Sequence, residues 1–204
     1  FTMNGSTLQI RQGVVIDHET RASYAVRVRA SDSIKHAEQA FTINITDINE
    51  FPSAAELSSS SIAENTSTSL GPVTIGQLLA SDPDGQAVSF SLVDGTGADN
   101  NSQFQVDGDQ LKVRQGVTLD HEAKPTFQVR VRTTDGTNST DREFTITVLD
   151  VNESPSTPEL TGDSVLESAS TVGGPVDVGT LSSNDPEGAT ITWSLVNGIG
   201  AGDN

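Results

Sequence analysis

The sequence predicts an all-β protein built from tandem copies of one small β-sandwich, and two observations carry this prediction. Apolar residues occupy every second position in several short segments, which is the period of strands that bury one face. A long pattern of residues also returns at a fixed offset, from Phe1 to Phe104, or 103 residues. No segment shows a sustained helical period. These features favour a repeat array of strands over a helical or mixed fold.

The strands expected within one period are short and follow each other closely. In "FQVRVR" at 127–132, apolar and polar residues alternate strictly, and "FTITV" at 144–148 and "YAVRV" at 24–28 repeat the pattern. The arginines at the polar positions are expected on a solvated sheet face. Five further strands are expected at 57–63, 73–80, 87–93, 103–107 and 110–115. Seven strands separated by Gly, Asp, Asn and Pro predict an antiparallel sandwich.

Self-comparison fixes the phase of the repeat. "FTMNGSTLQIRQGVVIDHE" at 1–19 aligns with "FQVDGDQLKVRQGVTLDHE" at 104–122, and "SDPDGQAVSFSLVDGTGADN" at 81–100 aligns with residues 184–204, with one inserted residue. The predicted units are therefore the back half of a repeat at 1–50, a complete repeat at 51–153 and the front half of a third at 154–204. Because the two halves are complementary, the front half of one chain could complete the back half of the next, which would give head-to-tail assembly.

Composition narrows the classes of partner. The chain has 11 basic and 28 acidic residues, a net charge of −17 and no cysteine. Such an acidic surface repels nucleic acid and anionic lipid, and it favours cations. The absence of cysteine excludes disulfides and thiolate metal sites. No apolar run has the length of a transmembrane helix, so no membrane insertion is expected.

Acidic or amide residues spaced two apart occur at three places in each period. These pairs are Asp17 and Glu19, Asp47 and Asn49, Asp82 and Asp84, and their copies Asp120 and Glu122, Asp150 and Asn152, Asp185 and Glu187. In an extended segment, residues two apart project to the same side, and converging carboxylates repel unless a cation or a proton lies between them. Each pair also has a simpler interpretation as a turn, a solvated loop or a strand end. Spacing alone leaves both interpretations open.

The histidines and the carboxylate pairs do not form a recognisable catalytic set. His18 and His121 each lie between two acids of a "DHE" segment. In an extended segment they would point away from those acids, so zinc ligation is not expected. No nucleophile–base arrangement is visible, and the paired carboxylates recur once per repeat at domain ends, which fits junctions better than a glycosidase site. An enzyme is not expected.

Several short motifs together resemble the cadherin repeat, in the version found in large bacterial surface adhesins. They are Glu64 followed by Asn65, "DPD" at 82–84, "LDHE" at 119–122, "TDG" at 134–136 and "LDVNESP" at 149–155. The resemblance spans the chain. It implies tandem seven-stranded Greek-key sandwiches of cadherin (Ig-like) type, with up to three Ca²⁺ ions at each junction between successive repeats.

Carried over by position, the resemblance implies two sets of calcium ligands. The first junction would use Asp17, Glu19, Asp47, Asn49, Glu50, Asp82, Asp84 and Asp135. The second would use Glu64, Asp120, Glu122, Asp150, Asn152, Glu153, Asp185 and Glu187. The chain departs from the family pattern at Glu50, Glu153 and Glu187, where the family has Asp, and at Phe51 and Ser154, where it has Asn. A longer side chain can still bind the ion, and it can also shift or remove one ion.

The function implied by this resemblance is structural. Calcium would stiffen the repeats into an extender of a large extracellular bacterial adhesin or fibre at the cell surface, mediating adhesion or assembly. Its expected partners are neighbouring repeats, other copies head to tail and cell-surface glycan. The alternative is a polysaccharide-binding or homophilic module. Carbohydrate sites usually offer exposed aromatic rings, but the chain has one Trp, one Tyr and seven Phe. Most of them fall at alternating core positions, and Trp193, which matches Phe90, is expected in the core.

Overall fold

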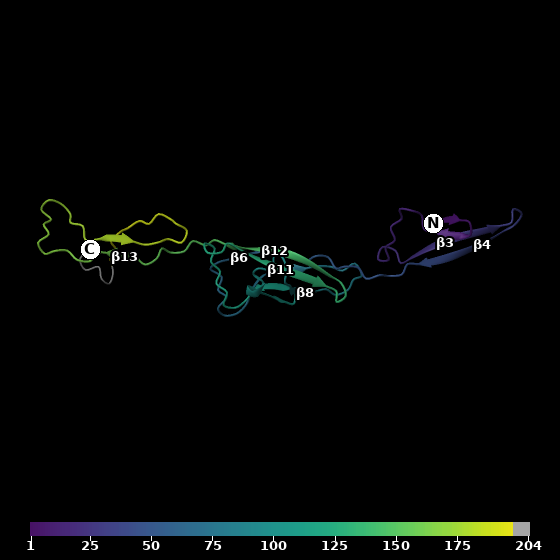
Figure 1. Cartoon of the computed structure of the whole chain (residues 1–204), viewed down its shortest axis with the longest axis horizontal. Helices are drawn as coiled ribbons and strands as arrows, with labels where there is room; N and C mark the ends of the chain where they lie inside the picture. The colour runs from purple at the N-terminus through teal and green to yellow at the C-terminus, as the bar shows by residue number, and fades with distance from the viewer. Residues whose placement is uncertain (198–204) are drawn as a thin grey trace.

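A computed structural model describes residues 1–197, and its strands form three separate groups along one long axis (Figure 1). The first group contains β1 (Thr2–Asn4), β2 (Thr7–Gln9), β3 (Ser23–Ser31) and β4 (His36–Asn44). The last contains β13 (Glu159–Thr161) and β14 (Thr180–Ser182). The end of the predicted third unit, residues 198–204, lies outside the described residues.

The middle group forms a complete two-sheet sandwich. Its elements are β5 (Glu56–Leu57), β6 (Ser61–Ala63), β7 (Val73–Leu79), β8 (Ser89–Leu92), η1 (Asn101–Gln103), β9 (Phe104–Asp107), β10 (Gln110–Val113), β11 (Thr126–Thr134) and β12 (Ser139–Leu149). One sheet has the order β5-β7-β10-β9 and the other β6-β12-β11-β8. All neighbouring strands are antiparallel except β6 and β12, which are parallel. The predicted all-β sandwich is confirmed.

The strand predicted at 57–63 is wrong in one respect, because it is two strands in opposite sheets. β5 pairs with β7, and β6 pairs with β12. The crossing between them is held on both sides: the Ser58 N–H donates to Gln77 O at 2.9 Å, and the Ser60 carbonyl accepts from Thr147 N at 2.8 Å. A single extended pattern cannot reveal this break, because both pieces bury residues in the same core.

The core lies between the two sheets of the middle repeat. The predicted alternation is confirmed: Phe127, Val129 and Val131 on β11 are buried, as are Ile146 and Val148 on β12. From the opposite sheet they meet Leu78, Phe104, Leu111 and Val113, all buried in the same cluster. Burying each of these side chains contributes about 1.5–3 kcal/mol, so this cluster accounts for much of the stability of the repeat.

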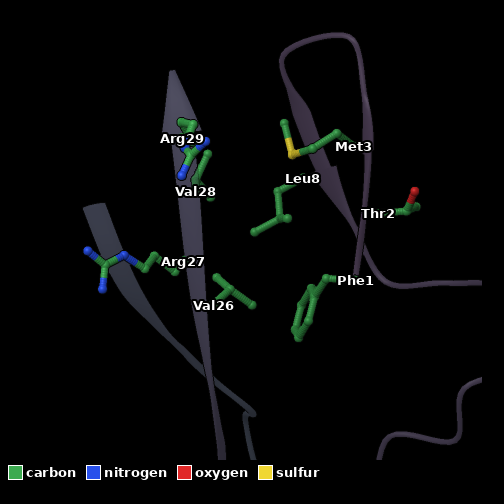
Figure 2. A pocket seen from close by; sticks show the side chains of 8 residues that line it. All are labelled: Phe1, Thr2, Met3, Leu8, Val26, Arg27, Val28 and Arg29. Carbon is green, nitrogen blue, oxygen red and sulfur yellow. The ribbon is translucent and has the colours of Figure 1, made fainter. Parts of the chain in front are cut away.

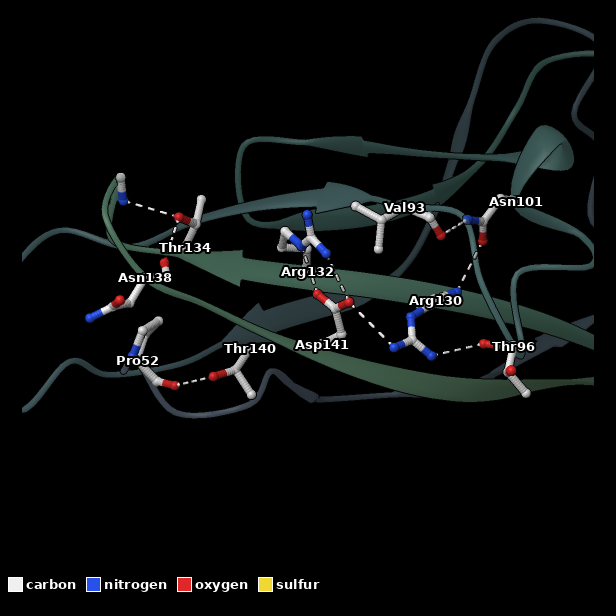
Figure 3. A network of polar contacts seen from close by, with 11 residues as sticks. Pro52, Val93, Thr96, Asn101, Arg130, Arg132, Thr134, Asn138, Thr140 and Asp141 are labelled. Carbon is white, nitrogen blue, oxygen red and sulfur yellow. Dashed lines mark hydrogen bonds and ion pairs between the residues drawn. The ribbon is translucent and has the colours of Figure 1, made fainter. Parts of the chain in front are cut away.

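A polar network covers the outer face of β11 and β12 (Figure 3). Arg132 donates to both carboxylate oxygens of Asp141, at 2.7 and 3.0 Å, and Arg130 reaches the same carboxylate at 3.3 Å. The loop after β8 is attached to this network, because Arg130 also donates to Thr96 O at 3.0 Å. These arginines therefore lie on the solvent side of the sheet, as predicted, but as members of ion pairs.

Trp193 is the aromatic residue that the sequence places in the core, and this expectation is wrong for the described structure. Its side chain is 43% exposed. Its counterpart Phe90 lies on β8, which pairs with β11. Within residues 1–197, no strand pairs with the segment around Trp193, so its ring is only partly covered.

Gly76 provides a direct test of the strand crossing. A Cβ at this position would lie 2.6 Å from the Ser59 carbonyl oxygen and 2.8 Å from its nitrogen, and backbone atoms cannot move aside easily. We expect Gly76→Ala to lower the free energy of unfolding by about 1–3 kcal/mol in urea denaturation. Gly71→Ala is the matched control, since a Cβ there meets nothing within 4 Å. Equal stability of the two variants would contradict the close crossing.

Asp141 gives the network a predictable pH dependence. Its hydrogen bond from Arg132, with the charges of Arg132 and Arg130, holds the pKa of Asp141 below its usual value. A lowered folded-state pKa stabilises the protein above the ordinary carboxyl pKa of about 3.9, and this stabilisation disappears as pH falls through the lower folded value. Asp141→Asn should therefore lower the melting temperature at pH 7, and the difference from the parent should shrink below about pH 4. Asp94→Asn, at an exposed loop position, should show no such difference.

Candidate metal centres

The first candidate centre lies where the linker after β4 meets the middle repeat. One carboxylate oxygen from each of Glu19, Asp47, Glu50 and Asp84 lies within 4.8 Å of all the others. Glu19 belongs to the turn before β3, Asp47 and Glu50 to the linker, and Asp84 to the loop between β7 and β8. The fold thus brings together acids from three segments that are distant in sequence.

The second centre lies at the far end of the middle repeat and repeats the first at the same offset. Glu122, the counterpart of Glu19, takes part in three overlapping groups with the same 4.8 Å limit. Its partners are Glu64 and Asp120 in one group, Glu153 and Glu187 in another, and His121 and Asp150 in the third. Five carboxylates near one glutamate create a region of concentrated negative charge.

The loop "DPDG" is both a turn and part of the first centre. Gly85 has φ +73° and donates its N–H to Asp82 O at 3.1 Å, which is the hydrogen bond of a β-turn. Asp82 Oδ1 accepts from Asp84 N at 3.0 Å, so one oxygen of this side chain maintains the loop. The other oxygen, Asp82 Oδ2, is buried without a hydrogen-bond partner, and so is Asp84 Oδ1. The turn interpretation is therefore confirmed, and the metal interpretation stays a prediction that these two oxygens support.

The second centre also contains buried oxygens without partners. Glu153 Oε2 and Glu187 Oε2 are both buried and accept no hydrogen bond. Leaving a charged oxygen buried and unpaired costs free energy, and native proteins rarely do so without a proton or a cation nearby. These four atoms, two at each junction, are the best evidence that the acids surround a position for a positive charge.

The pKa values also reflect the close approach of the carboxylates. At the first centre, burial and the charge of Asp84 raise the pKa of Asp47, while burial and the charge of Glu19 raise the pKa of Glu50. At the second, the hydrogen bond with Glu187, together with burial, raises the pKa of Glu153 to about 7. The same hydrogen bond lowers the pKa of Glu187 to about 2. Opposite shifts of this kind are expected where two carboxylates lie too close together for both to be charged without a proton or a cation between them.

Glu64 is buried and fixes the geometry of the second centre. Its Oε2 accepts from His121 N and its Oε1 from Val151 N, both at 2.6 Å. The side chain therefore connects the start of the repeat to the "DHE" turn and to the linker. Each oxygen retains a second lone pair that could face a cation.

Six predicted ligands lie outside the carboxylate groups and make other contacts. Asp17 caps its own turn by accepting from Thr20 N at 2.8 Å, and this hydrogen bond lowers its pKa. Asn49 donates to Asp135 Oδ2 at 2.8 Å, which lowers the pKa of Asp135. The remaining contacts are Asp82 with the DPDG loop, Asn152 with Glu153 O at 2.9 Å, and Asp185 with Ala189 N at 3.0 Å.

The prediction that the histidines point away from the acids is wrong. His18 Nδ1 lies 3.0 Å from Glu19 Oε1 and 3.7 Å from Asp47 Oδ1, and His121 Nδ1 lies 3.2 Å from Glu122 Oε1. The cause is local: "DHE" forms a turn, in which Lys124 N donates to Asp120 O at 2.9 Å, so the alternation of an extended strand does not apply. Both histidines recur at the 103-residue offset of the acids. This recurrence was the sequence signal that could have placed them next to the acid clusters.

The residues present fit a hard divalent cation. Apart from the histidines at the edge, the donors in these groups are carboxylate oxygens. These carboxylate oxygens are irregularly arranged, and several belong to long glutamate side chains. Such a set suits the flexible six- to eight-fold coordination of Ca²⁺ better than the strict octahedron of Mg²⁺.

Comparison with known proteins gives consistent results. No family model matches the chain. It is 29% identical to cadherin-related family member 2 of Mus musculus over 154 residues, which cover 72% of this chain and 12% of that protein. It is 29% identical to protocadherin Fat 1 of Homo sapiens over 163 residues, which cover 76% of this chain and 4% of that protein. The chain is homologous to cadherin domains.

Solved structures support the cadherin fold. The chain matches extracellular cadherin domains 1–4 of protocadherin gamma B7 with a TM-score of 0.58 and 21% identity, covering 84% of this chain and 42% of that one. A structure of the gamma B7 cis-dimer matches with a TM-score of 0.57 and 20% identity, covering 85% of this chain and 44% of that one. The fold is therefore the cadherin-type, Ig-like β-sandwich. Among residues 1–197, no helix has the length and apolar character needed to span a membrane.

Glu64 should stabilise the middle repeat even in the absence of metal. Glu64→Ala would leave the His121 and Val151 N–H groups without their acceptors, and each buried orphan costs about 1–3 kcal/mol. We expect a lower midpoint in urea denaturation, measured in chelator. The matched control is Glu167→Ala, at the equivalent exposed position of the next repeat. If both substitutions were neutral, Glu64 would not connect these segments.

Proposed function

We propose that this chain is a calcium-stiffened structural segment of an extracellular cadherin-type array. The observation that carries the proposal is the set of buried, unpartnered carboxylate oxygens at both junctions: Asp82 Oδ2, Asp84 Oδ1, Glu153 Oε2 and Glu187 Oε2. A bound cation would give these oxygens their missing partner and offset the repulsion among the acids around them.

The residues that would hold calcium fall into two sets. At the first junction they are Glu19, Asp47, Glu50, Asp82 and Asp84, supported by Asp17, Asn49 and Asp135. At the second they are Glu64, Asp120, Glu122, Asp150, Glu153 and Glu187, supported by Asn152 and Asp185. When bound, the cation supplies positive charge that joins acids of one repeat to acids of the next.

The linkers determine where an ion-free junction would bend. At the first junction, residues from Asn49 onward are hydrogen bonded to the repeat that follows. Asn138 Nδ2 donates to Asn49 O and Glu50 O, each at 3.0 Å, and Glu50 N donates to Asp84 Oδ2 at 3.0 Å. Contacts of Asp47 with the preceding body are to the like charge of Glu19 and, at 3.7 Å, to His18 Nδ1. Without calcium, the bend would lie just before Asn49.

At the second junction the linker is hydrogen bonded to both repeats. Val151 N is held by Glu64 of the preceding repeat at 2.6 Å, and Glu153 N by Glu187 of the following one at 2.9 Å. Asn152 lies between these two anchor points. The free rotation of an ion-free junction would be limited to this residue and its neighbouring bonds.

Within this proposal the units are 1–50, 51–153 and 154–204, and the array is a non-enzymatic extender of a bacterial surface adhesin or fibre. The cadherin homology supports an extracellular, adhesive setting, and the acidic junctions support calcium as the ligand. Neighbouring repeats and further copies of the chain, head to tail, would be its partners. A second candidate, a glycan-binding module, is favoured by the exposed ring of Trp193. Glycan binding that survives loss of the acids would support that candidate.

Calcium titration tests the proposal. The chelator-stripped chain should bind several Ca²⁺ ions in calorimetry, with dissociation constants on the order of 10⁻⁴ to 10⁻³ M, the range of extracellular modules. Asp150→Ala should weaken binding and increase bending in small-angle scattering, because it removes one acid of the second centre while leaving the sandwich intact. Asp163→Ala, at an exposed position outside both centres, is the control.

Two outcomes would contradict the proposal. If calcium produced no heat in the calorimetric titration and no change in melting temperature, the acid clusters would not be calcium sites. An Asp150→Ala chain that binds and bends like the parent would show that this linker acid is not a ligand.

A further inference from the structure

The side-chain amide of the linker residue Asn49 is hydrogen bonded at both of its ends. Its nitrogen, Nδ2, donates to Asp135 Oδ2 at 2.8 Å and to the Glu50 carbonyl oxygen at 3.0 Å. Its oxygen, Oδ1, accepts from Gln86 Nε2. Turning this amide alone would place nitrogen against nitrogen and oxygen against oxygen. The three contacts therefore fix its orientation.

This orientation is the opposite of the one that a metal ligand needs. An amide binds Ca²⁺ through its oxygen, because the nitrogen carries two hydrogens and accepts nothing. In the structure the nitrogen faces Asp135, which the sequence predicts as a second ligand at the same junction. A cation held by Asp135 Oδ2 would have to displace this N–H. The Asn49 amide thus takes the place of a cation beside Asp135.

Other hydrogen bonds hold the backbone of the linker against the middle repeat. Asn138 Nδ2 donates to Asn49 O at 3.0 Å, and Asn138 N donates to Asp135 Oδ1 at 2.6 Å. Thr140 Oγ1 donates to Pro52 O at 2.8 Å (Figure 3). None of these contacts involves the side-chain amide of Asn49. The backbone can therefore keep its place when that amide turns.

The side chain of Gln86 is not required by the turn that carries it. Gln86 N donates to Asp82 Oδ1 at 3.4 Å, and Ala189 N, on the same turn of the next repeat, donates to Asp185 Oδ1 at 3.0 Å. The turn thus forms with either side chain. Within the described residues, the exposed side chain of Gln86 makes one hydrogen bond, to Asn49. It is therefore free to turn together with Asn49.

The same turn carries a buried oxygen without a partner. Asp82 is 9% exposed, and its Oδ2 accepts no hydrogen bond. Asp84, two residues later, accepts from Glu50 N of the linker at 3.0 Å. A cation attracted by the unpaired oxygen would therefore approach the Asn49–Gln86 pair.

We propose that Asn49 and Gln86 form an amide switch, which keeps the first linker ordered with or without a cation. Without a cation, the Asn49 nitrogen donates to Asp135, as in the structure. When a cation is bound, both amides rotate by half a turn, so that Asn49 offers its oxygen to the cation and its nitrogen to Gln86 Oε1. Gln86 serves both arrangements because its amide has a donor and an acceptor. This inference rests on the proposed calcium function and makes Gln86 a positioning residue.

NMR of the side-chain amides tests the switch in the full chain. As calcium chloride is added to the chelator-stripped protein, the amide resonances of Asn49 and Gln86 should move together, over the same range of calcium concentration. The resonance of Asn101, whose Nδ2 donates to Val93 O within the middle repeat, should not move. Met3→Leu is a control in the preceding body. Met3 lies in the groove between the β1–β2 hairpin and β3 (Figure 2), outside the linker and the acid groups, so this change should leave the shifts unaltered.

Substitutions at Gln86 separate the two arrangements. Gln86→Met removes one similar hydrogen bond from each, so the calcium Kd should change by less than about twofold. In chelator, the Asn49 side-chain N–H groups of this variant should exchange faster with water. Gln86→Glu can only accept, so it favours the turned amide. Its calcium Kd should lie about tenfold below that of Ala87→Glu, which adds the same charge at the next exposed position.

Three results would overturn the switch. They are a Gln86 resonance that stays in place while that of Asn49 moves, a Gln86→Met chain that binds calcium much more tightly than the parent, and equal Kd values for Gln86→Glu and Ala87→Glu. The second result would make Gln86 a lock on one orientation. Calcium that binds with heat but moves neither resonance would exclude the switch alone, whereas the absence of heat would exclude the proposed function and the switch with it.

Discussion

The rest of the structure depends on the packing of β11 and β12 against the opposite sheet. Phe127, Val129 and Val131 meet Leu78, Leu111 and Val113 in one cluster from which water is excluded. This contact makes the sandwich rigid enough for its loops to occupy fixed positions at both ends. The acids are carried by those loops and linkers, so a well-packed core allows like charges to be held together.

The two junctions use hydrogen bonds differently. At the first, the linker is hydrogen bonded to the repeat that follows, because Glu50 N donates to Asp84. At the second, the linker is hydrogen bonded on both sides, to Glu64 of the preceding repeat and to Glu187 of the following one. Carboxylates from both repeats gather around each linker. Under the calcium proposal, the ion offsets the repulsion that these hydrogen bonds leave in place.

Much of the fold, and part of the site, could be predicted from the sequence. Alternation in 127–131 and 144–148 predicted the central strands, because burial on one face imposes a period of two. The break between β5 and β6 could not be predicted, since both pieces contact the same core from different sheets. His18 and His121 were misplaced because a turn replaces the assumed extended segment. The contact between Asn49 and Asp135 depends on residues 86 positions apart and has no local signal.

The position of Asn152 between two anchored residues has a mechanical consequence for a long array. Val151 is hydrogen bonded to one repeat and Glu153 to the next. The linker therefore cannot lengthen when the junction loosens, because only Asn152 lies between the two anchored residues. Under the calcium proposal, loss of the ion would change the direction of successive repeats while leaving their spacing nearly constant. The calcium concentration would then set the persistence length of such an array and leave its contour length unchanged.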